Sequence, residues 1–353
     1  MKILLLSHCF YPQIGGIEVN SEVIADSLVS MNHEVHIVTW SLDTGDKIFP
    51  FKVVRRPSFF KLIAEHKWAD VILENNPCLR LSWPNVLFSK PLVIVLNTWV
   101  SRVSGKVAFQ DILKLKWMQH ASKVIAVSTA VKNATFKNAI VIGNPYRDKL
   151  FKNLKHIERN KDFVFLGRLV SDKGADLAIK AFEQLIGLNE LHYAENSKLT
   201  LTVIGDGPDL NNLKNLVKNS GICDQVFFTG TLVGESLINS LNQHRFLLVP
   251  SRWKEPFGNI ALEGLACGCI PIVADGGGLP EAIGEAGFVF ERDNLNSLVN
   301  AMLQLLNNSD LVECLRSKAE AHLGHHTPSV VCSKYNDVLV DAMKPELIQL
   351  TCS

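Results

Sequence analysis

Short, continuously apolar segments alternate with stretches of helical spacing along most of the 353-residue chain. In the first half, residues 17–31 and 111–119 carry apolar side chains every three or four positions, as amphipathic helices do. The strand-like segments there are 2–6, 34–40, 71–73, 92–96, 123–127 and 139–142. Strands spaced by helices are typical of parallel βαβ units, and a parallel sheet covered on both faces has continuously apolar strands.

A polar, basic stretch at residues 149–162 interrupts this rhythm and is the predicted linker. The pattern then resumes with strands at 163–166, 199–204, 226–228, 246–249 and 270–274, and helices at 175–188, 209–219, 234–242, 259–267, 295–306, 311–321 and 329–343. A chain of this length accommodates two cores. We therefore predict an α/β protein with two Rossmann-like, doubly wound domains at residues 1–155 and 156–328, followed by a helical segment at 329–353.

The composition narrows the class of protein. A hydrophobic content of 47% with 20% charged residues excludes a disordered or collagen-like chain. No apolar run reaches the roughly 18–20 residues that span a bilayer, and Ser7 and His8 interrupt the N-terminal run too early for a signal peptide. The eight cysteines include no C-x-x-C pair, which favours buried thiols in a reducing compartment. We therefore expect a cytoplasmic protein.

The charge is unevenly distributed. Residues 1–150 carry 18 basic and 11 acidic side chains, whereas residues 151–353 carry 18 and 24. A basic first half is suited to an anionic partner, and mutual attraction of two lobes is the alternative. Because the basic residues are scattered and no recognised nucleic-acid-binding module is present, we expect no nucleic acid among the partners.

Two predicted strand-to-helix loops have features that suit phosphate. Gly15 and Gly16 directly precede the first helix, where a close-approaching backbone and the helix N-terminus attract anions. In the loop 167–174, Arg168 and Lys173 lie five residues apart behind Gly167, a combination suited to a diphosphate. The G-x-x-x-x-G-K-[ST] motif is absent, and an ordinary turn or a solvated basic loop remains the alternative for each.

Two further loops are rich in glycine. Gly205 and Gly207 in the segment 204–208 only begin a dinucleotide fingerprint, because position 210 is Leu, and they indicate a tight turn instead. The run 275–281 contains three consecutive glycines, which suit a close backbone approach to a ligand or a flexible turn.

The segment 250–263 is the most informative. Its proline and glycine place Glu255 in a loop and Glu263 about one turn inside the following helix. The amides of Gly258, Asn259 and Ile260 then lie at the helix N-terminus between the two carboxylates. Phosphates at the amides, ribose at one carboxylate and hexose at the other would fit a nucleotide sugar. A glycosidase with paired carboxylates is left open by the spacing, although the phosphate-type loops disfavour it.

Taken in order, the motifs P-x-x-G-G, G-R-L-x-x-x-K-G, I-G-D-G-P, E-P-F-G, E-x7-E and G-G-L-P-E resemble those of retaining glycosyltransferases of the GT-B fold, family 4. The resemblance covers nearly the whole chain and is strongest over residues 163–290. It implies two Rossmann-like domains facing a cleft, with the final helix crossing back to the N-terminal domain. It also implies a nucleoside-diphosphate sugar as donor, no cofactor and no bound metal.

The resemblance also assigns roles. Arg168 and Lys173 match the pair that neutralises the diphosphate, and Glu255 matches the carboxylate near the donor hexose. Glu263 matches the residue that binds the ribose hydroxyls, and Gly16 the glycine beneath the diphosphate. The predicted donor-binding set also includes Phe257, in the E-P-F-G motif, and the loop glycines Gly15, Gly167, Gly205 and Gly207.

One segment departs from the family pattern. After the strand 92–96, where many members carry a His or a carboxylate, this chain has Asn97, Thr98 and Trp99. Asn97 and Thr98 are therefore expected on the acceptor or sugar side, with no titratable group. The family reaction uses the departing phosphate to help deprotonate the acceptor, so this change is compatible with catalysis. A non-catalytic sugar-nucleotide-binding partner subunit and a GT-B nucleotide-sugar epimerase are the alternatives.

We therefore predict transfer of a hexose to an acceptor hydroxyl with retention of configuration, in glycan, polysaccharide or glycolipid synthesis. The segments 55–61 and 114–117 mix cations with large apolar side chains, which suits a membrane surface carrying a lipid-linked acceptor. Peripheral contact with the inner face of a membrane is one interpretation of these segments, and a solvated surface with buried aromatics is the other.

Overall fold

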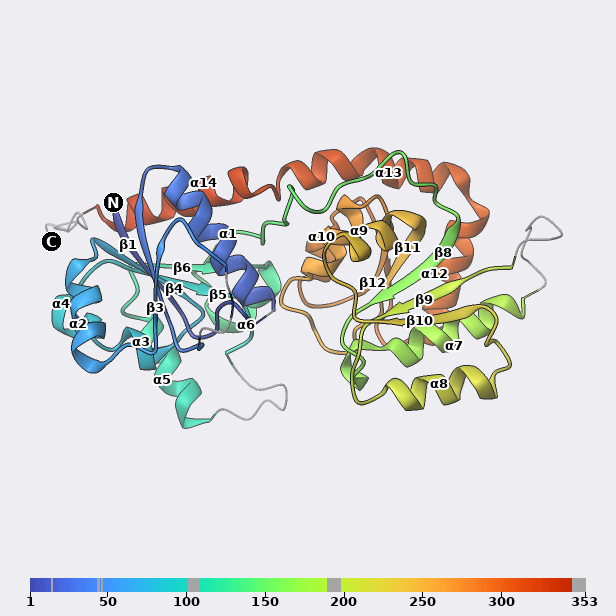
Figure 1. The fold of residues 1–353 in the computed structure, drawn as a ribbon, viewed down its shortest axis with the longest axis horizontal. Coiled ribbons are helices and arrows are strands. Elements are labelled where there is room, and N and C mark those ends of the chain that lie inside the picture. The colour runs from blue at the N-terminus through green and yellow to red at the C-terminus, as the bar shows by residue number, and fades with distance from the viewer. Residues whose placement is uncertain (14, 43–44, 46, 101–107, 189–197, 345–353) are drawn as a thin grey trace, which may run out of the picture. The chain divides into compact units, whose positions relative to one another are not determined.

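The computed structural model describes residues 1–13, 15–42, 45, 47–100, 108–188 and 198–344. The chain forms two compact units (Figure 1). Unit 1 comprises Met1–Pro145 and Pro328–Ser353, and unit 2 comprises Tyr146–Thr327. Each unit contains its own parallel sheet flanked by helices, so the predicted α/β fold class is confirmed.

Unit 1 is built on a seven-stranded sheet of order β3-β2-β1-β4-β5-β6-β7. Every strand pair in it is parallel, and the order reverses between β1 and β4. The strands are β1 Lys2–Ser7, β2 Glu34–Thr39, β3 Lys52–Arg55, β4 Val71–Asn75, β5 Leu92–Leu96, β6 Lys123–Ala126 and β7 Ile140–Val141. The helices are α1 Gly16–Ser30, α2 Phe59–Trp68, α3 Leu79–Ser82, α4 Asn85–Phe88, α5 Phe109–Met118, α6 Thr129–Thr135 and α14 Pro328–Ala342.

The last helix, α14, packs on α1 and β5 of unit 1 (Figure 1). Tyr335 is buried there, and Asn336 Oδ1 accepts a 2.8 Å hydrogen bond from Nε2 of His33. Asp341 forms an ion pair with Lys123 at 2.6 Å. The C-terminal helix is therefore part of the first unit despite its distance along the chain.

Unit 2 is built on a six-stranded parallel sheet of order β10-β9-β8-β11-β12-β13. Its strands are β8 Lys161–Leu166, β9 Leu201–Ile204, β10 Val226–Gly230, β11 His244–Val249, β12 Ile270–Ala274 and β13 Phe288–Phe290. Its helices are α7 Ala175–Ile186, α8 Leu210–Asn219, α9 Gly234–Gln243, α10 Asn259–Ala266, α11 Leu279–Ile283, α12 Leu295–Asn307 and α13 Ser309–Gly324.

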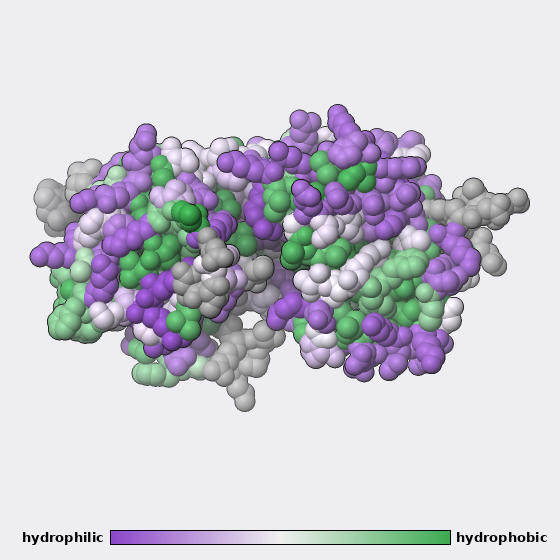
Figure 2. Space-filling view, in the orientation of Figure 1, coloured by the Kyte–Doolittle hydropathy of each residue, from purple (hydrophilic) through white to green (hydrophobic). Residues whose placement is uncertain are grey.

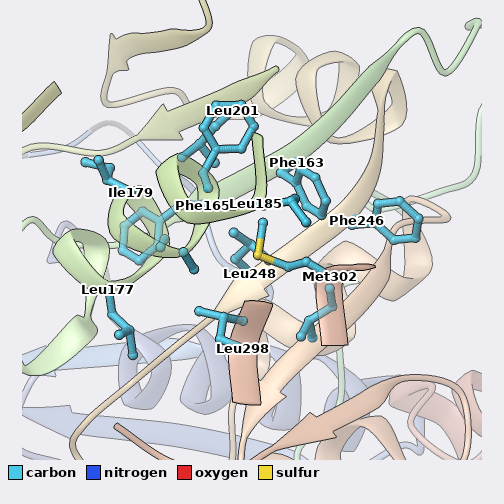
Figure 3. Packing of buried hydrophobic residues seen from close by; sticks show 14 of the residues in the cluster. Phe163, Phe165, Leu177, Ile179, Leu185, Leu201, Phe246, Leu248, Leu298 and Met302 are labelled. Atoms are coloured by element: carbon cyan, nitrogen blue, oxygen red, sulfur yellow. The ribbon is translucent and has the colours of Figure 1, made fainter. Parts of the chain in front are cut away.

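The larger core of unit 2 lies between its sheet and the helices α7 and α12 (Figure 3). Phe163 on β8 packs against Phe246 on β11, with ring centroids 5.4 Å apart, and against Phe182 on α7 at 6.3 Å. Leu298 and Met302 of α12 complete this core. The two central strands are thereby fixed side by side, and their ends carry the loops considered below.

The structure places the start of the second unit at Tyr146, ten residues before the predicted boundary at 155/156. The reason is packing that the polar character of the stretch 149–162 conceals. Phe151 is 2% exposed within the smaller core of unit 2. Asn242 accepts a hydrogen bond from the amide of Leu154 and donates one to the carbonyl of Lys152. This stretch is thus part of unit 2 and not a free linker.

Several elements were not predicted from the sequence, among them β3, α2 and β13. The strand β3 is short and lies at the edge of its sheet, so little of it is apolar. The helix α2 begins after Ser58, whose side chain accepts a hydrogen bond from the amide of Lys61. This N-cap lies inside the segment that was interpreted only as a basic, aromatic surface.

The seven cysteines that the structure describes are free thiols. Cys267 and Cys269, the two that are close in sequence, are both buried. Burial raises the pKa of Cys269 to about 12 and of Cys78 to about 11. These groups are therefore neutral packing side chains.

A buried carboxylate connects three elements of unit 1. Glu65 on α2 is 3% exposed, and its oxygens lie 2.8 Å from Lys52 Nζ, 2.7 Å from His36 Nδ1 and 3.0 Å from Lys61 Nζ. Burial alone would raise the pKa of Glu65, but the hydrogen bonds from these three groups outweigh it and lower the pKa to about 2. The carboxylate thereby joins α2 to β2 and β3.

We expect Glu65→Gln to lower the free energy of unfolding at neutral pH by about 1–3 kcal/mol, because the amide replaces a charged hydrogen-bond acceptor. The folded-state pKa lies below the unfolded one, so acid favours the unfolded state. The difference between wild type and variant should stay constant above about pH 4.5 and shrink as the pH falls towards 2. Urea denaturation across this range tests it, and a difference independent of pH would contradict the assignment.

Candidate functional site

The order of the sheet in unit 2 reverses between β8 and β11, which lie side by side. In parallel α/β sheets, ligands bind at the carboxyl ends of the strands where this reversal occurs. The loop after β8 holds Arg168 and Lys173, and the loop after β11 holds Glu255 and Gly258. Four predicted donor-site residues thus belong to the two loops that meet at this point.

Arg252 fixes these two loops to each other. Its guanidinium makes a bidentate ion pair with Asp176 at 2.7 and 2.9 Å, and it also donates to the carbonyl of Ser171 at 2.9 Å. The amides of Arg252 and Trp253 both donate to the carbonyl of Asp172. Bidentate pairs of this kind are the most geometrically specific side-chain contacts. No motif in the sequence indicated this role of Arg252.

This clamp brings Lys173 and Glu255 into contact. Lys173 Nζ lies 2.5 Å from Glu255 Oε1, and the Ser251 hydroxyl donates to the same oxygen at 2.9 Å. Both charged side chains are largely buried, at 16% and 13% exposure, and Lys173 Nζ lies 5.4 Å from the centre of the Trp253 ring. Lys173 was predicted to bind phosphate and Glu255 to bind the sugar. In this structure they form an ion pair and neutralise each other's charge.

Arg168 is exposed and takes no part in this pair. Together with Gly167 and Gly205 it lines a cavity of about 150 Å³ whose other walls include Asp206 and Thr231. The two cations predicted from the sequence thus lie in different surroundings. Lys173 is paired with Glu255, whereas Arg168 faces a small cavity at the ends of β8 and β9.

The predicted glycines of the β9 loop allow a close approach of two backbones. Gly205 has φ +143°, and a Cβ on it would lie 1.9 Å from the carbonyl oxygen of Gly167. A Cβ on Gly207 would lie 2.4 Å from the carbonyl oxygen of Leu169, whose amide donates to Asp206. These glycines hold the β9 loop against the loop that carries Arg168 and Lys173.

Helix α10 begins directly after Gly258, which has φ +122°. Asn259 and Ile260 lie in the first turn of α10, the positive end of the helix, where an anion is favoured. Phe257 differs from the expectation for a donor-binding side chain, since it is 3% exposed and packs 5.6 Å from the His326 ring.

The three-glycine run packs on protein backbone. A Cβ on Gly277 would lie 2.2 Å from the carbonyl oxygen of Glu255, and one on Gly278 would lie 2.3 Å from that of Pro256. The amide of Gly278 also donates to the Glu255 carbonyl at 2.8 Å. The run therefore supports the loop that holds Glu255 instead of lying open as a flexible turn.

Glu263 lies on α10 and pairs with Arg147, which comes from the start of unit 2. Arg147 NH2 donates to Glu263 Oε1 at 2.9 Å, and its guanidinium carbon lies 4.9 Å from the centre of the Phe151 ring. Burial raises the pKa of Glu263, and the charge of Arg147 opposes this shift. Because 116 residues separate the two, no local motif could have indicated the pair.

The remaining predicted residues belong to unit 1. Gly15 is the extended residue before α1, and Gly16 is the first residue of that helix. Asn97 is buried in an amide network: it donates to Asn75 Oδ1 at 2.6 Å and lies 3.4 Å from Asn20 Nδ2. Asn97 thus links β4, β5 and α1. Thr98 is half-buried beside it.

Unit 2 matches a known protein family. A family model described as glycosyl transferases group 1 matches residues 146–322, which is half of the chain and nearly all of unit 2.

The chain belongs to the group 1 glycosyltransferases.

Relatives of this glycosyltransferase extend over both units. It is 27% identical to an uncharacterized glycosyltransferase of Methanocaldococcus jannaschii, covering 89% of this chain and 91% of the relative. It is 23% identical to the N-acetyl-alpha-D-glucosaminyl L-malate synthase of Bacillus anthracis, covering 98% and 99%. A crystal structure of Anabaena HepE in complex with UDP and glucose matches the fold with a TM-score of 0.77, at 19% identity over 97% and 100% of the two chains.

Two further observations apply only to the residues that the structure describes. Within them, no group of three His, Cys, Asp or Glu side chains is arranged to hold a metal ion. None of the helices in these ranges has the length and apolar character needed to cross a membrane. That the enzyme needs no metal stays a prediction.

Alanine substitutions at two glycines can separate the effect of backbone strain from the effect of the contact between the loops after β8 and β11. Gly174 has φ +73°, and a Cβ on it would lie 2.1 Å from the carbonyl oxygen of Pro250. Gly221 has φ +69° and nothing within 4 Å. We expect Gly221→Ala to lower the free energy of unfolding by about 1–2 kcal/mol through strain alone. Gly174→Ala should cost clearly more, because the loops after β8 and β11 must separate.

Urea denaturation of both variants measures this difference. Equal losses of stability would show that the two loops shift apart without cost, which would contradict the tight contact between Gly174 and Pro250.

Proposed function

We propose that this glycosyltransferase moves a hexose from a nucleoside-diphosphate sugar to an acceptor hydroxyl with retention of anomeric configuration. The observation that carries the proposal is the Lys173–Glu255 pair, which the topology of unit 2 places where its sheet order reverses. In a family of sugar transferases, a cation suited to phosphate and a carboxylate suited to sugar hydroxyls at this edge favour a sugar diphosphate as substrate.

The pair would change partners when the donor binds. A diphosphate at Lys173 competes with Glu255 for the ammonium group, and the carboxylate is then available to accept hydrogen bonds from hexose hydroxyls. Ser251 keeps one carboxylate oxygen in place during this exchange, because its hydroxyl donates to Oε1 at 2.9 Å. Arg168 and the first amides of α10 would supply further donors to the phosphates.

In the reaction, the bond between the anomeric carbon and the β-phosphate oxygen breaks, and a bond from that carbon to the acceptor oxygen forms on the same face. The acceptor proton passes to the departing diphosphate. Lys173, Arg168 and the amides at the start of α10 stabilise the charge that develops there, which is commonly the largest contribution to such catalysis. No protein group has to titrate, so the neutral Asn97 and Thr98 after β5 are compatible with this scheme.

The relatives support the substrate class. The Bacillus anthracis relative is an N-acetyl-alpha-D-glucosaminyl L-malate synthase, and the HepE structure contains UDP and glucose. We propose that Glu263 takes the ribose hydroxyls of the donor and that no metal ion is required. We propose that the basic N-terminal half binds the acceptor, in glycan, polysaccharide or glycolipid synthesis.

We expect Lys173→Ala and Glu255→Ala each to reduce turnover by about 10²–10³, as the loss of one stabilising group at a developing charge does. Hydrolysis of UDP-, GDP- and ADP-sugars serves as the assay because it needs no acceptor. Reactions in EDTA test metal independence, and NMR of a transfer product gives the anomeric configuration.

Lys214→Ala is the matched control, because Lys214 is an exposed lysine on α8 of the same unit. It should leave turnover unchanged. Near-wild-type turnover in the Lys173 or Glu255 variant would remove that residue from the mechanism. Nucleotide binding without hydrolysis or transfer would instead indicate a partner subunit, and epimerisation without acceptor would indicate an epimerase.

We also propose that unit 1 contacts an anionic membrane surface through an apolar patch formed by Phe59, Phe60, Val86 and Leu87. These side chains are 60%, 81%, 69% and 62% exposed and come from α2 and α4, which pack together. Figure 2 shows hydrophobic surface at this end of unit 1. Exposed cations adjoin it in sequence, including Arg56 and Lys61.

The second basic segment, 114–117, supports this surface less directly. Trp117 donates through Nε1 to the buried Glu74 at 2.8 Å, so this ring anchors α5 to the sheet. The exposed apolar residues of α5 are instead Phe109, Ile112 and Leu113.

We expect the protein to co-sediment with vesicles containing phosphatidylglycerol at low salt, and binding should weaken at high salt, where the surface charges are screened. Replacing Phe59 and Phe60 by Ser should weaken binding at least about tenfold, since two large apolar groups no longer enter the interface. Phe227→Ser is the control, because Phe227 is 47% exposed in unit 2. Absence of binding at low salt would refute the membrane contact.

A further inference from the structure

Arg147 occupies a position that neither the motifs nor the proposed mechanism explain. It lies just after the start of unit 2, outside the sheet, and 116 residues before the carboxylate that it contacts. Its NH2 group lies 2.9 Å from Glu263 Oε1, and the guanidinium packs over the Phe151 ring at 4.9 Å. Phe151 is itself 2% exposed, so the arginine rests on a fixed surface of the core.

The pair leaves one carboxylate oxygen for another partner. Among the described residues, Arg147 is the hydrogen-bond partner of Glu263, and it contacts Oε1 alone. The Glu263 side chain is 14% exposed, so it is held in a largely dry environment where an orienting partner matters more than at a surface. Glu263 also lies one turn inside α10, whose first amides are the proposed phosphate donors.

We infer that Arg147 is a positioning residue for the donor nucleotide: by holding Oε1 of Glu263, it directs Oε2 towards the ribose hydroxyls. This inference rests on the proposed function, in which Glu263 takes those hydroxyls. Arg147 then acts on donor affinity through Glu263 and has no contact with the reacting atoms. Burial disfavours the charged form of the carboxylate, and the guanidinium offsets that effect.

A comparison of ribonucleotides with their 2′,3′-dideoxy counterparts tests this directly. UDP, GDP and ADP are first compared on the wild type by thermal shift and calorimetry, and the nucleotide that binds most tightly is used with its dideoxy form. Wild type should prefer the ribonucleotide by about 10- to 100-fold in Kd, the range for hydrogen bonds to a charged group. Arg147→Ala should lose most of that preference, and Arg147→Lys should recover only part of it.

Kinetics give the second readout. Because the ribose contact is made equally in the ground state and the transition state, Arg147→Ala should raise KM for the donor about 10-fold or more while kcat stays within about two- to threefold. Arg159→Lys is the matched control, since Arg159 is another arginine of unit 2, and its hydrogen bonds go to Asn153 and to the carbonyls of His244 and Cys267, not to the Glu263 carboxylate. It should keep the full ribose preference.

The possible results distinguish a failure of the proposed function from a failure of the inference about Arg147. If wild type does not distinguish the ribonucleotide from the dideoxy form, the ribose role of Glu263 fails, and with it the proposed donor mode. If wild type distinguishes them and a folded Arg147→Ala does so equally well, the inference about Arg147 is wrong while the proposed function stands. Should Arg147→Ala fail to fold, Arg147→Met takes its place, because Met can pack on Phe151 but cannot donate to Glu263; a full ribose preference in that variant would refute the inference.

Discussion

The candidate site depends on the clamp that Arg252 forms between the loops after β8 and β11. Parallel pairing makes the two strands neighbours, but it leaves the loops beyond them free to take many conformations. The bidentate contact with Asp176 and the two amide bonds to the Asp172 carbonyl remove that freedom. Glycines at 174, 277 and 278 then permit backbone contacts that any side chain would prevent. The meeting of Lys173 and Glu255 follows from this arrangement.

Much of the fold could be predicted from hydrophobic periodicity. Buried parallel strands are continuously apolar, so β1, β5, β8 and β12 stand out in the sequence, and amphipathic spacing marks α1 and α7. Where periodicity is weak, prediction failed. The edge strand β3 is half-exposed, and the N-cap Ser58 that starts α2 lies among basic and aromatic residues. The domain boundary was misplaced because one buried residue, Phe151, anchors an otherwise polar stretch to the core.

The residues of the candidate site also fall into those that the sequence could identify and those that it could not. Residues within one loop motif, such as Lys173 or Glu255, could be identified because glycine and proline spacing indicates where a loop faces a helix start. Contacts between distant segments left no signal in the sequence: Arg147 lies 116 residues from Glu263, and Arg252 lies 76 residues from Asp176. Asn97 was expected on the sugar side from its place after a strand, but the amide network that holds it depends on three separate elements. The chemical type of a site residue could be predicted from its own loop, whereas the residue that contacts it could be found only from the folded structure.

The Lys173–Glu255 pair has a consequence for anion selectivity. Any anion that takes over the Lys173 ammonium group displaces Glu255. The displaced carboxylate is only 13% exposed, so it then depends on hydroxyl groups for its hydrogen bonds. Inorganic phosphate or chloride supplies only the charge, whereas a sugar diphosphate supplies the charge and the hydroxyls in one molecule. In the proposed binding mode, the pair would therefore favour an intact donor over the small anions that are abundant in any cell.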